Sequence, residues 1–253
     1  MQEVVKKCLK ITNKISVVAF VVIFALSFTA FVNSIILKDL MKIGLSLAAL
    51  VLYFVPFFVK YMFKINLPTL LEVIYYLFIF ASLILGEVFA FYGPFPWWDV
   101  VLHYLSGFVL AGIGLSLTQI MNKNKSGKFF ALLFAFCFSV TLGTAWECIE
   151  FSFDITLRTD AQKDAHVHNI STITMQRDGG NQPVRLDDIV NTSINLASGE
   201  TITVDEGYLD IGLMDTMKDT FVNIAGALTF VVFGALSSSV AKNFVITKRQ
   251  YLK

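Results

Sequence analysis

The sequence predicts an all-α polytopic membrane protein with six transmembrane helices and a small β-rich extracytoplasmic insertion between the fifth and sixth helices. Hydrophobic residues make up 56% of the 253 residues and charged residues only 15%, whereas soluble domains average about 25% charged residues. The apolar residues are gathered in six long blocks, and one long polar segment separates the last two blocks. These observations together indicate a chain that crosses a membrane repeatedly.

Each block approaches the roughly twenty residues that cross about 30 Å of hydrocarbon. Helices satisfy every backbone N–H and C=O group within such a span. We therefore predict helices over residues 15–37, 43–59, 70–92, 100–120, 129–153 and 213–240. In this interpretation residues 1–240 form one membrane domain, which is interrupted by the insertion 155–212 and followed by a basic cytoplasmic tail, 241–253.

The blocks differ at their ends. The first follows a basic stretch, but it is too long for a signal-peptide core and no small-x-small cleavage site follows it, so we interpret it as an uncleaved signal anchor. The second is the shortest and ends near Pro56, and the third carries Glu87 near its outer end. The fourth block follows Trp97 and Trp98, and the fifth contains Trp146 near its end. Tryptophan is enriched at membrane–water interfaces, so these residues indicate where two spans meet the outer surface.

Basic residues flank the blocks unevenly, which sets the orientation by the positive-inside rule. With the N-terminus inside, thirteen of the twenty Lys and Arg residues lie on the cytoplasmic side: Lys6, Lys7, Lys10, Lys14, Lys60, Lys64, Lys123, Lys125, Lys128, Lys242, Lys248, Arg249 and Lys253. We therefore expect both termini in the cytoplasm. The net charge of +1 gives no indication of a nucleic-acid partner.

The polar segment between the fifth and sixth blocks contains alternating stretches that are typical of strands. They cover residues 170–175 and 189–196, and turn signals stand at residues 178–181 and 198–199. Residues 201–204 can return along the second stretch as a hairpin. The insertion is thus expected to be β-rich and extracytoplasmic.

Ionisable residues inside membrane spans are costly, and each is by default a functional candidate. The candidates in the last three helices are Asp99, His103, Glu147, Glu150, Asp219 and Asn223, with Asp215 at the start of the sixth helix. Within each helix they recur every three or four residues and therefore share one face. The topology brings all of them to the outer half of the membrane. We expect them to form an acidic pocket that opens outward.

Carboxylates gathered in this way raise one another's pKa unless protons, a basic partner or a cation compensate them. The hypothetical ligands of a divalent metal ion are His103, Glu147, Glu150, Asp215 and Asp219. Carboxylate and amide oxygens suit Mg²⁺, Ca²⁺ or Mn²⁺, and His103 would favour Zn²⁺ or Mn²⁺. The alternative is that these side chains join the helices to one another by hydrogen bonds.

Several of these residues also carry a resemblance to a known family. Trp98-Asp99 with His103 and Gly107, Trp146-Glu147 with Glu150, and residues 209–219 with Asn223 and Gly226 resemble the uncharacterised YjdF-like bacterial inner-membrane proteins. More distantly, the pattern is similar to the VanZ-like proteins, which carry Asp-x-x-x-His, a later Glu, and Asp-x-x-x-Asn-x-x-Gly on successive helices. The long insertion departs from that second pattern. The resemblance implies a bacterial plasma membrane and names no reaction.

Three functions fit these observations. The first is a metal-dependent enzyme that acts on an envelope lipid head group or a lipid-linked precursor. The second is a non-catalytic membrane protein whose acids hold the helices together and whose insertion binds a partner. The third is an ion-coupled transporter, although its acids would then be expected near the midplane. Membrane lipids are the expected surroundings in every case.

Overall fold

The computed structural model describes residues 13–122, 127–176, 179–236, 244 and 246–248. Within these residues, six helices are long and apolar enough to cross a membrane, and they cover Lys14–Ile36, Leu40–Met62, Thr69–Val88, Trp97–Met121, Lys128–Leu157 and Leu213–Leu236. The predicted six-helix fold class is confirmed. Many basic residues used for the orientation lie outside the described residues: Lys6, Lys7, Lys10, Lys123, Lys125, Lys242, Arg249 and Lys253.

The helices along the chain are α2 (Lys14–Ile36), α3 (Leu40–Leu52), α4 (Val55–Met62), α5 (Thr69–Ile79), η1 (Phe80–Val88), α6 (Trp97–Asn122), α7 (Lys128–Leu157) and α8 (Leu213–Leu236). The second span consists of α3 and α4, and Pro56 lies in the first turn of α4, where a missing N–H costs no helical hydrogen bond. The chain divides into two compact units, residues 1–143 with 221–253, and residues 144–220.

The third span changes its helical winding halfway. It is α-helical to Ile79 and continues as the π-helix η1 to Val88, so the regular helix expected to Tyr92 is shorter. The Trp98 indole N–H donates to the carbonyl of Ala81 within the π-helical part at 3.1 Å. This winding cannot be seen in hydropathy, because an α-helix and a π-helix need the same apolar residues.

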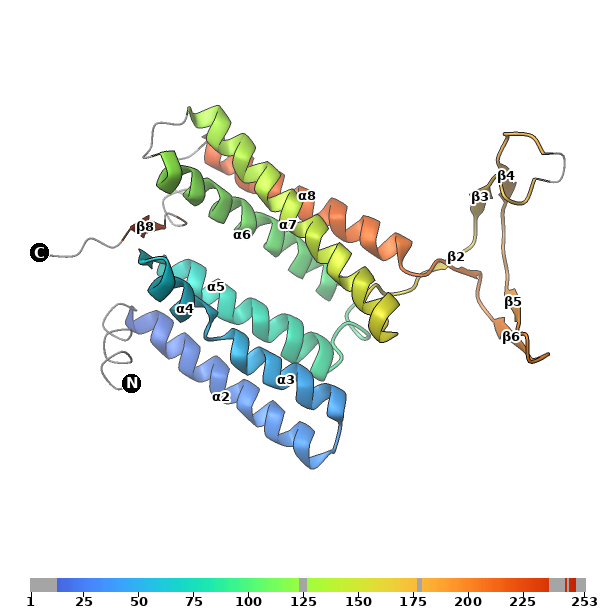
Figure 1. Cartoon of the computed structure of the whole chain (residues 1–253), viewed down its shortest axis with the longest axis horizontal. Coiled ribbons are helices and arrows are strands. Elements are labelled where there is room, and N and C mark those ends of the chain that lie inside the picture. The colour runs from blue at the N-terminus through green and yellow to red at the C-terminus, as the bar shows by residue number, and fades with distance from the viewer. Residues whose placement is uncertain (1–12, 123–126, 177–178, 237–243, 245, 249–253) are drawn as a thin grey trace, which may run out of the picture. The chain divides into compact units, whose positions relative to one another are not determined.

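A first apolar core joins α2, α3, α5 and η1, which lie side by side in Figure 1. Its buried members are Ile23, Ala30, Ala49, Tyr53, Tyr76, Ile84 and Val88. Buried polar side chains accompany this core. The Lys60 ammonium donates to Glu72 at 2.9 Å, and the Ser16 hydroxyl donates to the other oxygen of the same carboxylate. A charged pair is therefore enclosed among three spans.

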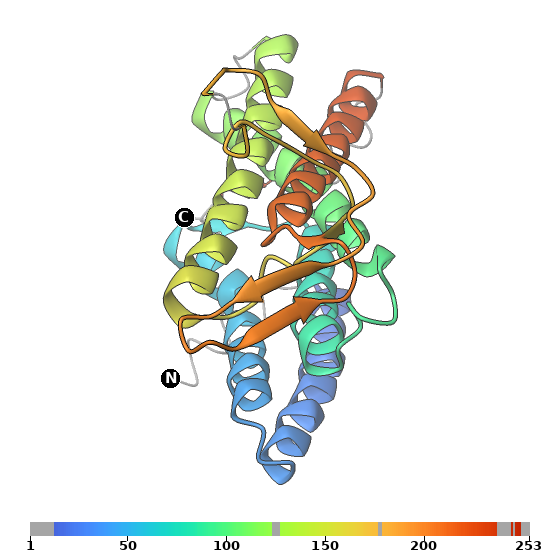
Figure 2. The same ribbon diagram turned by 90° about the vertical axis from the view of Figure 1, so that its right-hand side faces the viewer.

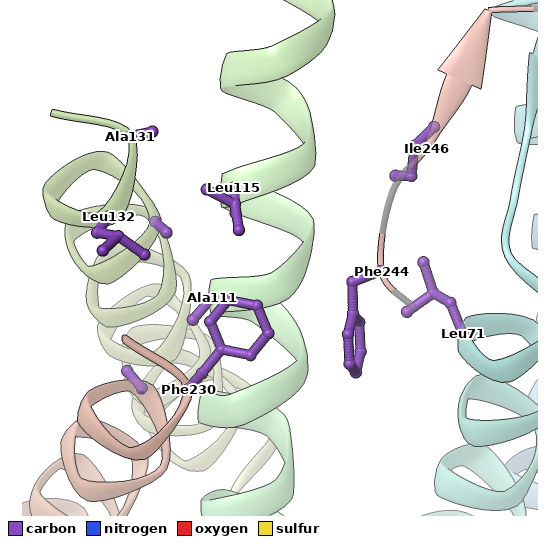
Figure 3. Close-up of a cluster of buried hydrophobic side chains, with 10 residues drawn as sticks. Leu71, Ala111, Leu115, Ala131, Leu132, Phe230, Phe244 and Ile246 are labelled. Atoms are coloured by element: carbon purple, nitrogen blue, oxygen red, sulfur yellow. The ribbon is translucent and has the colours of Figure 1, made fainter. Parts of the chain in front are cut away.

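A second apolar core joins α5 to α6 and to the parts of α7 and α8 in the first unit. Its buried members are Leu71, Ala111, Leu115, Ala131, Leu132, Ala135, Ala227, Phe230, Phe244 and Ile246. Figure 3 shows that Phe244 and Ile246, from the end of the chain, lie beside α6 and Leu71. Residues 247–248 form β8, which pairs antiparallel with β1 (Ile65–Asn66).

The second unit contains the insertion, whose described residues, 155–176 and 179–212, form three antiparallel strand pairs. The strands are β2 (His166–Val167), β3 (Ile170–Thr172), β4 (Val184–Leu186), β5 (Thr192–Asn195), β6 (Thr201–Val204) and β7 (Tyr208–Leu209). β2 pairs with β7, β3 with β4 and β5 with β6. Figure 2 shows the β5–β6 pair as a hairpin, in which Ile194 stands opposite Ile202. The expected β-rich insertion between the fifth and sixth spans is confirmed.

The pKa of Asp164 in the insertion lies above the ordinary 3.8, although the side chain is exposed. Desolvation of the carboxyl group and the nearby carboxylates of Asp160 and Asp210 raise this pKa. A raised pKa in the folded state means that Asp164 stabilises the fold below its unfolded pKa and loses this contribution as pH rises through the folded pKa. We expect Asp164→Asn to slow protease cleavage of the insertion at neutral pH. The difference in cleavage rate between acid and neutral pH should become smaller. The control is Asp205→Asn on an exposed turn; equal effects of both substitutions would contradict the prediction.

Candidate functional site

Two predicted site residues meet on α6. The Asp99 carboxylate and the His103 Nε2 atom lie 3.5 Å apart across one helical turn, and both side chains are largely shielded from solvent. The distance is at the long limit of a hydrogen bond. The pair thus places a carboxylate oxygen and an imidazole nitrogen next to each other, where both could bind the same ion.

Asn223 of α8 joins that helix to α6. Its side chain is 2% exposed, and its amide N–H donates to the Ser106 hydroxyl at 3.1 Å. Ser106 in turn donates to the His103 carbonyl. A Cβ atom on Gly107 would lie 2.1 Å from the Asn223 carbonyl oxygen, so glycine is what allows the two helix backbones to meet here.

The same Asn223 side chain also lies against α7. A Cβ atom on Gly143 would lie 2.6 Å from the Asn223 amide. Close by, the Ser139 hydroxyl donates to the Gly107 carbonyl at 2.8 Å. Asn223 is therefore the point at which α6, α7 and α8 are in mutual contact. In the sequence Gly107 and Gly226 stood out through the family resemblance, and Ser106, Ser139 and Gly143 carried no signal, since serine and glycine are common in membrane helices.

Asp215 and Asp219 lie one turn apart near the start of α8, in the second unit. The Asp215 carboxylate accepts from the Lys163 backbone N–H at 3.0 Å and from the Lys218 ammonium at 3.4 Å. Asp219 is only 1% exposed, and its carboxylate lies 3.7 Å from the Lys218 ammonium. Asp215 thus anchors the insertion to α8, whereas Asp219 is the buried acid of the pair.

The two glutamates of α7 have different surroundings. Glu147 is 5% exposed. Glu150 accepts a hydrogen bond from the Trp146 indole at 2.8 Å along the helix surface. Both belong to the second unit, and the burial of Glu147 makes it the stronger candidate for chemistry.

Two further aspartates, near the end of α7 and the start of α8, accept hydrogen bonds from backbone N–H groups. Asp154 accepts from the backbone N–H groups of Ala161 and Gln162 at 2.6 and 2.8 Å. Asp210 accepts from Ala165 and Met214 at 2.8 and 2.6 Å. These contacts satisfy backbone donors where the insertion leaves and rejoins the helices.

The ion pair of Lys60 and Glu72 was not among the predicted site residues. Both side chains are about 3% exposed, in α4 and α5. Lys60 lies just after the second block and was counted among the flanking basic residues, whereas Glu72 near the start of the third block was not singled out. Only the packing of α2 and α4 over the start of α5 encloses them.

Comparison with known proteins gives one family. The family described as "Predicted membrane protein (DUF2238)" matches residues 15–239. No curated protein and no solved structure matches the chain.

Proposed function

The chain belongs to the DUF2238 family of predicted membrane proteins, and on this premise we propose that it is a multi-pass plasma-membrane protein that binds a divalent metal ion through Asp99 and His103 of α6. Asp99 and His103 each offer one ligand atom within the first unit. Asp219 and Glu147 are proposed as further ligands from the helical spacing of the acidic residues in the sequence. The observation that carries the proposal is the pairing of Asp99 with His103, because it joins the two ligand types that Zn²⁺ or Mn²⁺ accepts.

The contacts of Asn223 support the position of His103 within the first unit. Asn223 meets Gly107 of α6 and Gly143 of α7. Because residues four apart share a helix face, His103 lies one turn from Gly107 on the side of α6 that faces Asn223.

The distance between Asp99 and His103 also fits a shared ion. Two ligands of a tetrahedral ion with bonds of about 2.0–2.1 Å stand roughly 3.4 Å apart, and the observed separation is 3.5 Å. A bound divalent ion would act there as a Lewis acid toward a polar head group. Glu147 is suited to hold or move a proton, since it is a buried carboxyl group one turn from Gly143.

The proposed substrate class is an envelope lipid or a lipid-linked precursor whose head group reaches the pocket from the bilayer. The orientation with both termini in the cytoplasm, which would make the pocket face outward, belongs to the same proposal and is supported by the distribution of Lys and Arg. Membership of the narrower YjdF-like or VanZ-like families and a location in the bacterial inner membrane also remain predictions.

The test is the metal content of the detergent-purified full chain. We expect a stoichiometric divalent ion in the native protein. His103→Ala and Asp219→Asn should each weaken binding by more than the roughly 10–100-fold that loss of an outer-shell partner costs. The matched controls are His168→Ala and Asp205→Asn, which change the same residue types on the exposed insertion.

Two outcomes would contradict the proposal. One is a native protein that binds no added Zn²⁺ or Mn²⁺ while remaining folded. The other is unchanged metal binding in well-folded His103→Ala and Asp219→Asn variants. If these variants lose thermal stability and the native protein binds no metal, the polar residues serve to hold the helices together, and the exposed insertion becomes the candidate for partner binding.

A further inference from the structure

A buried polar group lies at the start of α5, where α2 and α4 meet it. The Lys60 ammonium donates to one oxygen of the Glu72 carboxylate at 2.9 Å, and the Ser16 hydroxyl of α2 donates to the other oxygen. All three residues are at most 3% exposed. Ionisable residues inside membrane spans are costly and are by default functional candidates. The proposed metal site uses none of these residues, so the group calls for a role of its own.

Tyr76 lies one turn after Glu72 on α5, so the two side chains share a helix face. Tyr76 is fully buried, and its hydroxyl has no hydrogen-bond partner among the described residues. The polar groups near this hydroxyl include Ser16 and the Glu72 carboxylate, but neither lies in direct hydrogen-bonding geometry with it. A phenol hydroxyl is thus enclosed near a carboxylate that it does not bond directly.

The Tyr76 ring is held in place by other aromatic rings. Phe20, Tyr53 and Tyr75 stand edge-on to it, with ring centroids 5.6, 6.2 and 6.0 Å away. The hydroxyl therefore cannot turn toward another partner unless this cluster moves. Tyr53 is equally buried, but its hydroxyl lies 2.8 Å from the Ser27 hydroxyl. Buried hydroxyls in proteins are bonded either to protein atoms or to ordered water, so ordered water is the partner that suits Tyr76.

We propose that Tyr76, Glu72 and Ser16 bind one internal water molecule. Buried waters make about three hydrogen bonds, and these three side chains supply the partners. The water accepts from the Tyr76 hydroxyl and donates to the Glu72 carboxylate and the Ser16 oxygen. It thereby joins Tyr76 to the Lys60–Glu72 pair in one hydrogen-bonded chain. A proton can pass along this chain, because each hand-over breaks one O–H bond, forms another and needs no further reactant.

The first test labels the native full chain in detergent with hydroxyl radicals that an X-ray pulse generates from water. These radicals modify a buried side chain only where water lies next to it. We expect Tyr76 to be labelled severalfold faster than Tyr53, although both are 0% exposed. Equal labelling rates of the two buried tyrosines would overturn the proposal.

The double variant Lys60→Met with Glu72→Leu separates an internal water from bulk solvent. It removes the carboxylate that holds the water, so the labelling rate of Tyr76 should fall to that of Tyr53. Fast labelling of Tyr76 that persists in this variant would show that bulk water arrives through opening of the helices, and the proposal would then be wrong.

The sign of a stability change gives a second test. Loss of a hydroxyl that bonds to water or protein lowers stability, whereas loss of a buried hydroxyl without a partner is neutral or stabilising. We therefore expect Tyr76→Phe to lower the melting temperature, as Tyr53→Phe should through loss of the Ser27 contact. A melting temperature of Tyr76→Phe equal to or above that of the native protein would contradict the proposal.

Proton movement at Tyr76 is followed by infrared spectroscopy. The difference spectrum between the native protein and Tyr76→Phe isolates one hydroxyl group, and Tyr53→Phe isolates the matched one. After transfer into heavy water, the Tyr76 hydroxyl should exchange its proton before the Tyr53 hydroxyl does, because the internal water supplies the deuteron. Exchange at Tyr76 no faster than at Tyr53 would rule out the chain.

Discussion

Lys60→Met is expected to destabilise the protein by about 3–5 kcal/mol, because it leaves the Glu72 charge buried without its cation. The two side chains are 4% and 3% exposed, and their charged atoms lie 2.9 Å apart. The remaining contact of Glu72, from the Ser16 hydroxyl, is a hydrogen bond and does not neutralise the carboxylate. The measurement is the thermal or denaturant unfolding of the purified full chain in detergent.

The double variant Lys60→Met with Glu72→Leu provides the decisive comparison. Well-packed apolar residues often replace a buried ion pair without loss, so the double variant should recover most of the stability that Lys60→Met loses. Lys42→Met is the control, because its pair with Asp39 is more than a third exposed on both sides and should matter by less than about 1 kcal/mol. A double variant as unstable as the single one would show that the pair does not act as a unit.

Gly226→Ala is expected to be nearly as damaging, at about 3 kcal/mol, which is the upper part of the range for overpacking. The added Cβ atom would lie 2.0 Å from the Tyr104 carbonyl oxygen and 3.0 Å from the Phe108 nitrogen. These are backbone atoms of α6, so no side-chain rotation can relieve the contact. α6 and α8 would have to separate where Tyr104 also donates to Thr229.

The matched substitution is Gly44→Ala in α3, where no atom lies within 4 Å of the new methyl group. Alanine favours a helix over glycine by up to about 1 kcal/mol, so Gly44→Ala should leave stability unchanged or raise it. Both proteins are compared by their melting temperature and by their monodispersity in detergent. Equal melting temperatures would show that α6 and α8 do not approach one another closely.

The sequence by itself determined the six membrane spans, since about twenty consecutive apolar residues have no other way to satisfy their backbone polar groups. It also determined the β-rich character of the insertion through alternation and turn residues. For the candidate site, helical spacing was enough to place Asp99 and His103 on one face, where they pair. Gly107 and Gly226 stood out through the family resemblance, and both lie where helix backbones meet.

Other features were decided only by tertiary structure. Lys60 was counted among the flanking basic residues and Glu72 was not singled out, and both are buried because α2, α4 and α5 enclose them. The Asp215 carboxylate accepts from the Lys163 backbone N–H, because the path of the insertion brings that donor to it. Phe244 and Ile246 belong to a stretch that was predicted to be a basic tail, and they are buried because Gly112 and Ser116 of α6 offer them space and hydrogen bonds. The physical reason is the same in each case: hydropathy and periodicity act along one helix, whereas the burial of a charge, a carboxylate or a chain end depends on which neighbouring elements the fold brings to it.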